Sequence, residues 1–409
     1  LVTVMSWILC FALVGCLRIV RVLTDPDEKL RRIEDCSTRT LDSAILLQTH
    51  AYKTTHGQLE AAIDEPRAIP PVFSEDFGPR ETIVVHGVAG PPKIDPTVMH
   101  QLWNAGMLPD AIRSKACCTL ENGPSPSASQ KLLSRVTLAS ELELKFVTPV
   151  KIFCGTYTME ANHDTNVKTL KNTWGKRCDG WVAFSTKDDP SIPAINLTHE
   201  GEESYDNMWQ KSRSIWRYIG AHYAQDFDWF LLGGDDMYYT LENLRYYLGS
   251  PEIQAAQAKG GGMFLGRRFF PPGMQVYNSG GAGYLLDRKA LGILFDSIDT
   301  NPNCWMHENT FREDVNVANC LRQGGGIEPL DTRDASKRER FHPFTPGQHL
   351  EYRAPPDGDD WYLQYNPELA YGFECCSDRS ISWHYTTAPI MQEVHDFLYH
   401  CEQKPSLSA

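Results

Sequence analysis

The stretch of sequence that decides the fold is Trp229-Phe230-Leu231-Leu232-Gly233-Gly234-Asp235-Asp236-Met237-Tyr238-Tyr239. A short apolar run that is bounded by turn residues favours a buried strand of a parallel sheet over a helix. Ligands of open α/β sheets bind outside the carboxyl ends of the strands, which is where Asp235 and Asp236 emerge. Two adjacent carboxylates are costly to hold together without a cation, and their hard oxygen atoms suit Mg²⁺ or Mn²⁺. An ordinary acidic turn after a strand would explain the same residues if the stretch stood alone.

Strand and helix patterns alternate around this stretch. Strands are expected at 150–157, 181–185, 229–232, 263–265 and 283–286, and helices at 165–174, 205–219, 241–248 and 288–295. The helix that begins near Tyr205 is indicated by an apolar stripe that includes Met208, Trp209, Ile215 and Ile219. Such β-α alternation predicts an α/β fold with a mostly parallel central sheet and helices on both faces.

Composition excludes some classes of partner. The chain has 409 residues, enough for one large α/β domain with a long attachment. Its formal net charge of -13 argues against nucleic acid, because phosphate backbones are met by clustered lysine and arginine. A nucleotide ligand remains compatible with this charge, since a bound metal ion can supply the positive charge.

Cysteine usage indicates an oxidising compartment. The chain has 12 cysteines, but their spacing fits no structural zinc site. The adjacent pairs Cys117-Cys118 and Cys375-Cys376, with several spaced single cysteines, fit disulfide formation. The triplet Asn196-Leu197-Thr198 is a glycosylation sequon, which is weak support by itself. Together these features predict the secretory pathway.

The N-terminal part predicts a membrane attachment. Residues 1–17 carry no charge, and the apolar segment 1–23 is just long enough to span a bilayer as an anchor. A cleaved signal peptide and a buried core helix are the alternatives, and the flanking charges do not fix an orientation. Residues 24–146, rich in proline and glycine in their second half, are interpreted as a stem with some local structure. Residues 147–401 are then the main α/β domain and 402–409 a C-terminal tail.

Three further groups of residues could carry chemistry. Asn278-Ser-Gly-Gly-Ala-Gly283 precedes a strand, and its glycines either line a sugar or phosphate or form a flexible turn. Asp314 of the Glu313-Asp314 pair begins an expected helix over 314–322, where a carboxylate is either a cap or a general base. His342 and His384 lie among aromatic residues, a setting in which a packed core histidine is the more frequent outcome.

Residues 150–400 resemble the inverting β1,3-glycosyltransferase family that holds Fringe and the core 1 β1,3-galactosyltransferases. The matching pieces occur in the family's order: Lys171-Asn-Thr-Trp174, Arg177-Cys178, Asp228-Trp-Phe-Leu231, Asp235-Asp236, Gly266-Arg-Arg-Phe269, Ser279-Gly-Gly-Ala-Gly-Tyr284, Glu313-Asp314, Asp331-Thr-Arg-Asp334, Phe341-His-Pro-Phe344, Cys375-Cys-Ser-Asp378 and Trp383-His-Tyr385. The resemblance implies a GT-A type fold, a UDP-sugar donor, a Mn²⁺ ion, and action on O-linked glycoproteins in the Golgi or ER-Golgi membrane with the catalytic domain in the lumen.

The resemblance also assigns roles to residues of this chain. Asp314 would be the catalytic base, and Asp236 and His384 would bind the metal. The UDP-sugar would be held by Thr158, Arg177, Asp235, Gly280, Gly281 and Arg267, and the acceptor by Trp361 and Tyr362. Disulfides are implied for Cys154–Cys178, Cys304–Cys320 and Cys375–Cys376. The chain departs from the family at Gly234, which replaces the first Asp of an Asp-Asp-Asp triplet and puts donor affinity or identity in question.

The expected reaction is a single in-line displacement on a UDP-sugar, with galactose as the first choice of sugar. Asp314 would take the proton from the 3-hydroxyl of an O-linked GalNAc, giving a β1,3 linkage, while Mn²⁺ stabilises the leaving UDP. Other readings are a β1,3-transferase that uses UDP-GlcNAc or UDP-glucose, and a catalytically silent relative that acts as a chaperone. A homodimer is also compatible with the sequence.

Overall fold

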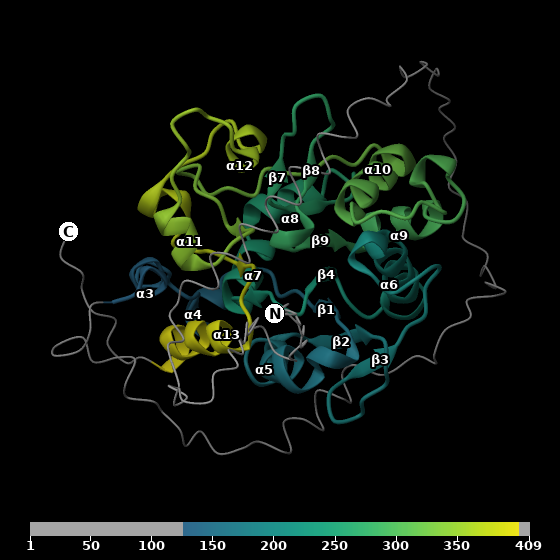
Figure 1. Ribbon diagram of the computed structural model, residues 1–409, viewed down its shortest axis with the longest axis horizontal. Coiled ribbons are helices and arrows are strands. Elements are labelled where there is room, and N and C mark those ends of the chain that lie inside the picture. The colour runs from purple at the N-terminus through teal and green to yellow at the C-terminus, as the bar shows by residue number, and fades with distance from the viewer. Residues whose placement is uncertain (1–125, 401–409) are drawn as a thin grey trace, which may run out of the picture. The chain divides into compact units, whose positions relative to one another are not determined.

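The computed structural model describes residues 126–400 and shows an α/β fold built on a six-stranded sheet (Figure 1). The strand order is β3-β2-β1-β4-β9-β6. Its strands are β1 (Ile152–Tyr157), β2 (Gly180–Ser185), β3 (Ala194–Asn196), β4 (Trp229–Gly234), β6 (Phe264–Gly266) and β9 (Tyr284–Asp287). The first four in spatial order are parallel, whereas β9 runs antiparallel to both β4 and β6. The predicted mostly parallel sheet is therefore confirmed, with one strand reversed.

Side chains of the central strands alternate between two cores, as the period of a strand requires. In β4, Trp229 and Leu231 belong to one buried cluster, and Phe230 and Leu232 belong to the other. Both faces are apolar because helices cover both. This double burial is why the strand reads in the sequence as a continuous apolar run and not as an alternating one.

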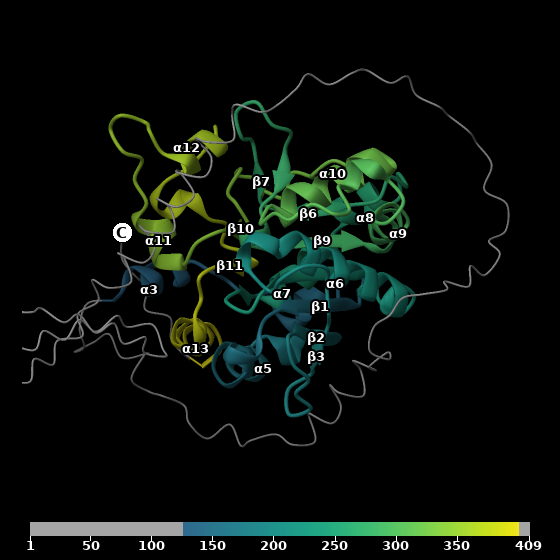
Figure 2. The same cartoon turned by 45° about the vertical axis from the view of Figure 1, so that its right-hand side comes forward.

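Helices lie on the two faces of the sheet (Figure 2). One face is covered by α6 (Met208–Tyr223), α9 (Arg288–Ser297) and α10 (Glu313–Gly325). The other is covered by α5 (Lys168–Asn172), α7 (Leu241–Leu248), α8 (Pro251–Gln257) and α13 (Ala388–His395). The expected helix over 165–174 is shorter, because a π-helical turn at His163–Val167 precedes α5.

Two smaller sheets complete the domain. The order β10-β11-β5 joins β10 (Phe341–His342), β11 (Ser382–Trp383) and β5 (Tyr238–Tyr239), and β7 (Arg268–Phe269) pairs with β8 (Tyr277–Asn278). β5 and β11 are antiparallel, with Trp383 opposite Tyr238. Helices α11 (Pro346–Glu351) and α12 (Trp361–Tyr365) lie in the segment between β10 and β11.

The structure confirms all three disulfides that the resemblance implied. Disulfide bonds join Cys154 to Cys178, Cys304 to Cys320, and Cys375 to Cys376. The first ties the middle of β1 to the residue that lies two positions before β2. The second ties the segment before α10 to the helix itself.

Part of the predicted stem, residues 126–146, is described and packs on the domain. It contains α3 (Ala128–Leu133) and α4 (Glu141–Leu144), and Leu132, Leu133 and Val136 are buried in the core with strand residues of the sheet. The predicted anchor at 1–23 and the tail at 402–409 lie outside the described residues. Within residues 126–400 no helix is long and apolar enough to cross a membrane.

Candidate active site

The site is built where β4 ends, at the edge of the sheet predicted from the sequence. Asp235 and Asp236 follow Gly234, the last residue of the strand. The next residues to form a strand are Tyr238 and Tyr239 of β5, which pair with β11. Because His384 directly follows β11, this small sheet brings it to Asp236 from the far end of the chain.

Asp236 and His384, the predicted metal ligands, face one another. The Nε2 atom of His384 lies 3.4 Å from Oδ2 of Asp236, and both side chains keep some access to solvent. The Nδ1–H of His384 donates to the carbonyl oxygen of Pro343 at 3.3 Å. The backbone carbonyl of Asp236 accepts bonds from the amide and the hydroxyl of Thr386. These contacts fix both groups so that a carboxylate oxygen and a ring nitrogen face one another.

This geometry fits a bound divalent cation. In the tautomer that carries its proton on Nδ1, bonded to Pro343, the ring of His384 turns the acceptor atom Nε2 to the carboxylate of Asp236. Two such acceptors repel unless a proton or a cation lies between them. At metal–ligand bonds of about 2.1 Å, two ligand atoms at roughly a right angle lie about 3 Å apart, close to the observed separation.

Asp235 has a different environment, because its carboxylate is occupied by hydrogen bonds. It accepts from the hydroxyl of Thr158, from Nδ2 of Asn162 at 2.8 Å and from Nδ2 of Asn166 at 3.2 Å. Burial raises the pKa of Asp235, and the bonds from Thr158 and Asn162 act in the opposite direction. Asp235 thus anchors the end of β4 to the segment after β1, and Thr158 contributes to that anchor.

Asp314 lies in the first turn of α10, with both oxygen atoms held by backbone amides. The N–H of Gly280 donates to Oδ2 and the N–H of Val315 donates to Oδ1, each at 2.8 Å. Removal of the carboxyl from water raises the pKa of Asp314 to about 6, although both amides lower it. The N-cap of α10 is Arg312, so Asp314 is not the capping residue that its local sequence also allowed.

The neighbouring Glu313 is buried, and its carboxylate is held by a different set of partners. Its carboxylate accepts from the hydroxyl of Tyr284 at 2.7 Å, and that hydroxyl accepts from the indole of Trp216 at 3.1 Å. Burial, followed by the charge of Asp314, raises the pKa of Glu313 to about 8. Glu313 is therefore protonated at neutral pH and adds no second charge beside Asp314.

Gly280 and Gly281 lie between the two parts of the site, which are Glu313 with Asp314 and Asp236 with His384. A Cβ atom on Gly280 would overlap Oε1 of Glu313 and lie 3.4 Å from the Cβ of Asp314. A Cβ atom on Gly281 would lie 3.0 Å from Nδ1 of His384. Two consecutive residues therefore contact the predicted base on one side and the predicted metal ligand on the other. Their lack of side chains is what allows both groups to approach.

The other predicted site residues are distributed unevenly. Arg177 donates to Glu242 at 2.6 Å and lies over the ring of Tyr399. The structure therefore does not pair it with Asp235, Asp236 or Asp314. Arg267 is 2% exposed and donates to Tyr362 and Asn366. It supports the position of α12 from within the domain.

The predicted acceptor residues lie beside an aromatic wall. Tyr362 is buried and is held by Arg267, whereas Trp361 is half-buried and packs edge-on against Phe344. Phe344 in turn stacks on Tyr385, next to His384. Of the two predicted residues, Trp361 is the more exposed.

Several residues of the site carry no sequence signal. Asn162 ends a short 3-10 helix and Asn166 lies in the π-helical turn, and both donate to Asp235, but no sequence pattern indicates this. Lys211 is buried, donates to the carbonyl of Thr158 at 2.6 Å and pairs with Glu203. From the sequence alone, a lysine in this helix is expected to be exposed to solvent, so its burial was not predictable.

Two other features lie apart from this site. The three-ligand group found within the described part of the chain is His342, His349 and Cys376. The sulfur of Cys376 is bonded to Cys375, so it is not a free thiolate ligand, and His342 stacks on Trp383 as a core residue.

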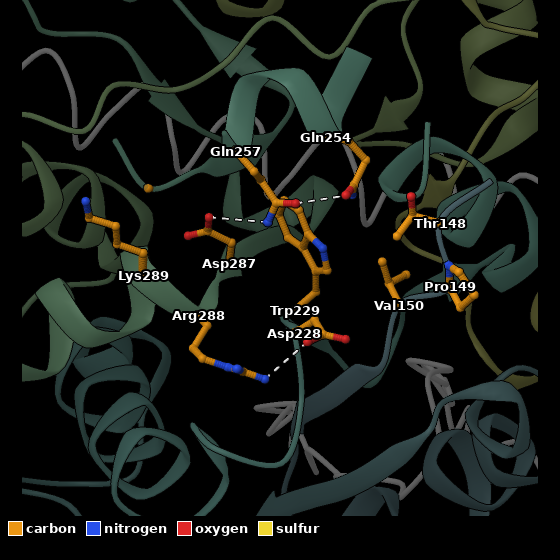
Figure 3. Close-up of a pocket in the computed structure, with 11 residues that line it drawn as sticks. Thr148, Pro149, Val150, Asp228, Trp229, Gln254, Gln257, Asp287, Arg288 and Lys289 are labelled. Atoms are coloured by element: carbon orange, nitrogen blue, oxygen red, sulfur yellow. Dashed lines mark hydrogen bonds and ion pairs between the residues drawn. The ribbon is translucent and has the colours of Figure 1, made fainter. Parts of the chain in front are cut away.

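A cavity of about 370 Å³ lies at the opposite end of β4 (Figure 3). Its lining includes Trp229 at the start of the strand, together with Asp228, Asp287 and Arg288. Arg288 donates to Asp228 there at 3.1 Å. Since β4 runs from Trp229 towards Asp236, the cavity is separated from the candidate active site by the length of the strand.

Comparison with known proteins points to one family. The chain is 34% identical over 253 residues to a glycoprotein-N-acetylgalactosamine 3-beta-galactosyltransferase 1 from Xenopus laevis, covering 61% of this chain and 67% of the relative. It is 26% identical over 192 residues to chondroitin sulfate synthase 3 of Mus musculus and 25% identical over 190 residues to that of Homo sapiens. Each of these matches covers 43% of this chain and only 21% of the synthase. No family model matches the chain.

The first of these similarities covers two thirds of the relative, and the central sheet fits a GT-A type fold. The chain belongs to the inverting β1,3-glycosyltransferase family and is a hexosyltransferase similar to the glycoprotein-N-acetylgalactosamine 3-β-galactosyltransferases.

Proposed function

We propose that this chain transfers galactose from UDP-galactose to the 3-hydroxyl of GalNAc that is O-linked to glycoproteins, with inversion to a β1,3 linkage. The observation that carries the proposal is the Gly280-Gly281 dipeptide, which contacts Asp314 on one side and His384 on the other. A base and a ligand pair thus share one site. The name of the Xenopus laevis relative supports the choice of galactose and GalNAc.

Asp236 and His384 would hold a Mn²⁺ ion, since their facing acceptor atoms fit a cation. When bound, such an ion supplies Lewis-acid stabilisation to the leaving diphosphate. Asp235 keeps the end of β4 in place through its bonds to Thr158, Asn162 and Asn166.

Asp314 would act as the general base on the acceptor. As the acceptor 3-oxygen bonds to the anomeric carbon, the bond from that carbon to the diphosphate breaks, and the hydroxyl proton passes to Asp314. The amides of Gly280 and Val315 orient the carboxylate and leave each oxygen a free lone pair for the proton. A pKa near 6 suits this work, because the group is ionised at neutral pH and still basic enough to take a proton.

The proposal includes the cellular location of the protein. We place its action in the lumen of the Golgi, which the three disulfides support because disulfides persist in oxidising compartments. Anchoring through residues 1–23 rests on the apolar sequence of that segment.

The experiment that tests the proposal is a screen of UDP-sugars against a GalNAc-α-Ser/Thr peptide, with and without Mn²⁺. We expect transfer of galactose that requires the metal and gives a product cleaved by a β1,3-specific galactosidase. Transfer of GlcNAc or glucose in place of galactose would assign another donor.

A catalytically silent, chaperone-like relative is the second candidate, favoured by Gly234 at the position of a family carboxylate. It predicts no transfer and no UDP release with any UDP-sugar. The convergence of Asp314, Asp236 and His384 supports the enzyme over this candidate.

A further inference from the structure

Gly234 and Tyr157 face one another at the ends of adjacent strands. They are the last residues of β4 and β1, and the parallel register pairs them directly. A Cβ atom on Gly234 would lie 3.1 Å from Cε2 of the Tyr157 ring and 2.8 Å from Oδ1 of Asp236. Real Cβ atoms rarely approach other atoms so closely, so the ring of Tyr157 occupies space that a side chain at position 234 would need.

Tyr157 lies beside the carboxylates that follow β4, because Gly234, the residue that it faces, directly precedes Asp235 and Asp236. The carboxyl groups of Glu313, beside the predicted base, and of Asp236, the predicted metal ligand, are both near enough to influence the pKa of its phenol. In an in-line displacement, the sugar being transferred must lie between the metal-bound leaving group and the base. A side chain that is near both of these carboxyl groups is therefore placed to contact that sugar.

The chemistry of a phenol suits a sugar at this place. Its ring offers an apolar face, and its hydroxyl can both donate and accept a hydrogen bond. Burial, followed by the influence of the Glu313 and Asp236 carboxyl groups, raises the pKa of Tyr157 well above its usual range. The hydroxyl consequently stays protonated at every working pH and remains a donor to a sugar oxygen.

We propose that Tyr157 contacts the hexose of the UDP-hexose donor and that its phenol, admitted by glycine at position 234, selects among hexoses. This inference rests on the proposed function and adds a specificity-determining residue to it. No sequence pattern marks Tyr157, because a tyrosine at the end of a buried strand is an ordinary strand residue.

The test separates the sugar from the nucleotide. Tyr157→Phe keeps the ring and removes only the hydroxyl, and Tyr246→Phe, a half-buried tyrosine whose ring faces Arg379, is the matched control. Binding of UDP and of UDP-galactose, UDP-glucose and UDP-GlcNAc is measured by calorimetry, and kcat/KM is measured for each donor. We expect Tyr157→Phe to change the ratio of kcat/KM between donors by about tenfold, the effect of one lost hydrogen bond, and to leave UDP affinity unchanged.

Gly234→Ala tests the other partner of the pair. The added Cβ should push on the Tyr157 ring, so the donor ratio should shift, and Tyr157→Ala in the same chain should change that shift because contacting residues are coupled. Strictly additive effects on the donor ratio would contradict the pairing.

The outcomes distinguish this inference from the proposed function. If the wild type transfers sugar but Tyr157→Phe affects all donors and UDP equally, Tyr157 is a structural wall and the inference is wrong. A second outcome is that the wild type transfers no sugar but binds a UDP-hexose more tightly than UDP. If Tyr157→Phe removes that difference in affinity, the inference holds and the proposed function fails. If the wild type binds UDP and all three UDP-hexoses with the same affinity, the inference is wrong.

Discussion

At the scale of single residues, Asp314 is the group whose environment has the clearest chemical consequence. Its two oxygen atoms accept backbone N–H groups, yet loss of water around it raises its pKa to about 6. A base works only when it is deprotonated, so its ionisation should appear directly in the pH dependence of the rate.

We expect kcat/KM to rise with pH through about 6 and to be about tenfold lower at pH 5 than on the plateau, since one proton titrates. Asp314→Asn should lower kcat by roughly 10²–10⁴-fold at all pH values and abolish this acidic limb. Affinity for UDP with Mn²⁺ is the control and should persist. Joint loss of activity and UDP binding would instead identify Asp314 as a structural residue.

Glu313 should tolerate replacement far better than its neighbour. Its folded-state pKa of about 8 lies above the ordinary value of 4.5, so the protonated form is favoured by folding. This contribution to stability is complete below pH 4.5 and is lost as the pH rises through 8. Glu313→Gln mimics the protonated form, whose stability does not depend on this titration. The stability of the variant minus that of the wild type should therefore be larger at pH 8.5 than at pH 5.

Thermal unfolding at the two pH values measures this effect, and activity near neutral pH should fall much less than in Asp314→Asn. An equal effect of Glu313→Gln on stability at both pH values would show that Glu313 is ionised throughout.

At the scale of elements, the turn at 279–283 and the small β10-β11-β5 sheet assemble the site. Gly283 has φ +70, and a Cβ atom there would overlap the hydroxyl of Tyr239 in β5. The hydroxyl of Ser382 in β11 also donates to the carbonyl of Ala282 at 2.6 Å. The turn and the small sheet are therefore fitted to one another at two points.

Gly283→Ala should destabilise the protein by roughly 2–4 kcal/mol, combining an unfavourable positive φ with overpacking. It should also weaken metal-dependent activity, since Tyr239 follows Asp236 closely in the chain. Gly292→Ala in α9 is the matched control, because a Cβ there meets nothing within 4 Å. That helical substitution should stabilise by about 0.5–1 kcal/mol. Urea unfolding compares both, and equal effects would contradict the fitted turn.

At the scale of the whole molecule, the residues before β1 belong to the domain's packing. Leu132, Leu133 and Val136 are buried, and the amide of Gly347 in α11 donates to the hydroxyl of Ser129 at 3.1 Å. Arg379 reaches back to Glu143 at 2.6 Å. Burial of each aliphatic side chain contributes roughly 1.5–3 kcal/mol, so their sum is comparable with the whole stability of a domain.

A chain that begins at residue 126 should fold and keep its transferase activity. A chain that begins at residue 147 should be unstable, because it loses these three side chains and exposes their partners. Urea unfolding and solubility of the two chains test this difference. Equal stability would mean that residues 126–146 are dispensable, as a stem that merely tethers the domain would be.

The sequence by itself determined the local elements of this protein. Apolar runs such as 229–232 predicted the central strands, and the carboxylates after Leu232 marked the functional edge, because strand burial and helix periodicity depend on neighbours in the chain. The resemblance supplied the three disulfides and the family, which local patterns do not contain.

Only the tertiary structure decided which residues meet. Asp236 and His384 are brought together by the pairing of β5 with β11, and Tyr157 meets Gly234 through the register of β1 with β4. It also showed that Arg177 pairs with Glu242 and that β9 is antiparallel. These outcomes depend on packing and register between segments far apart in the chain, and no periodicity within a single segment encodes them.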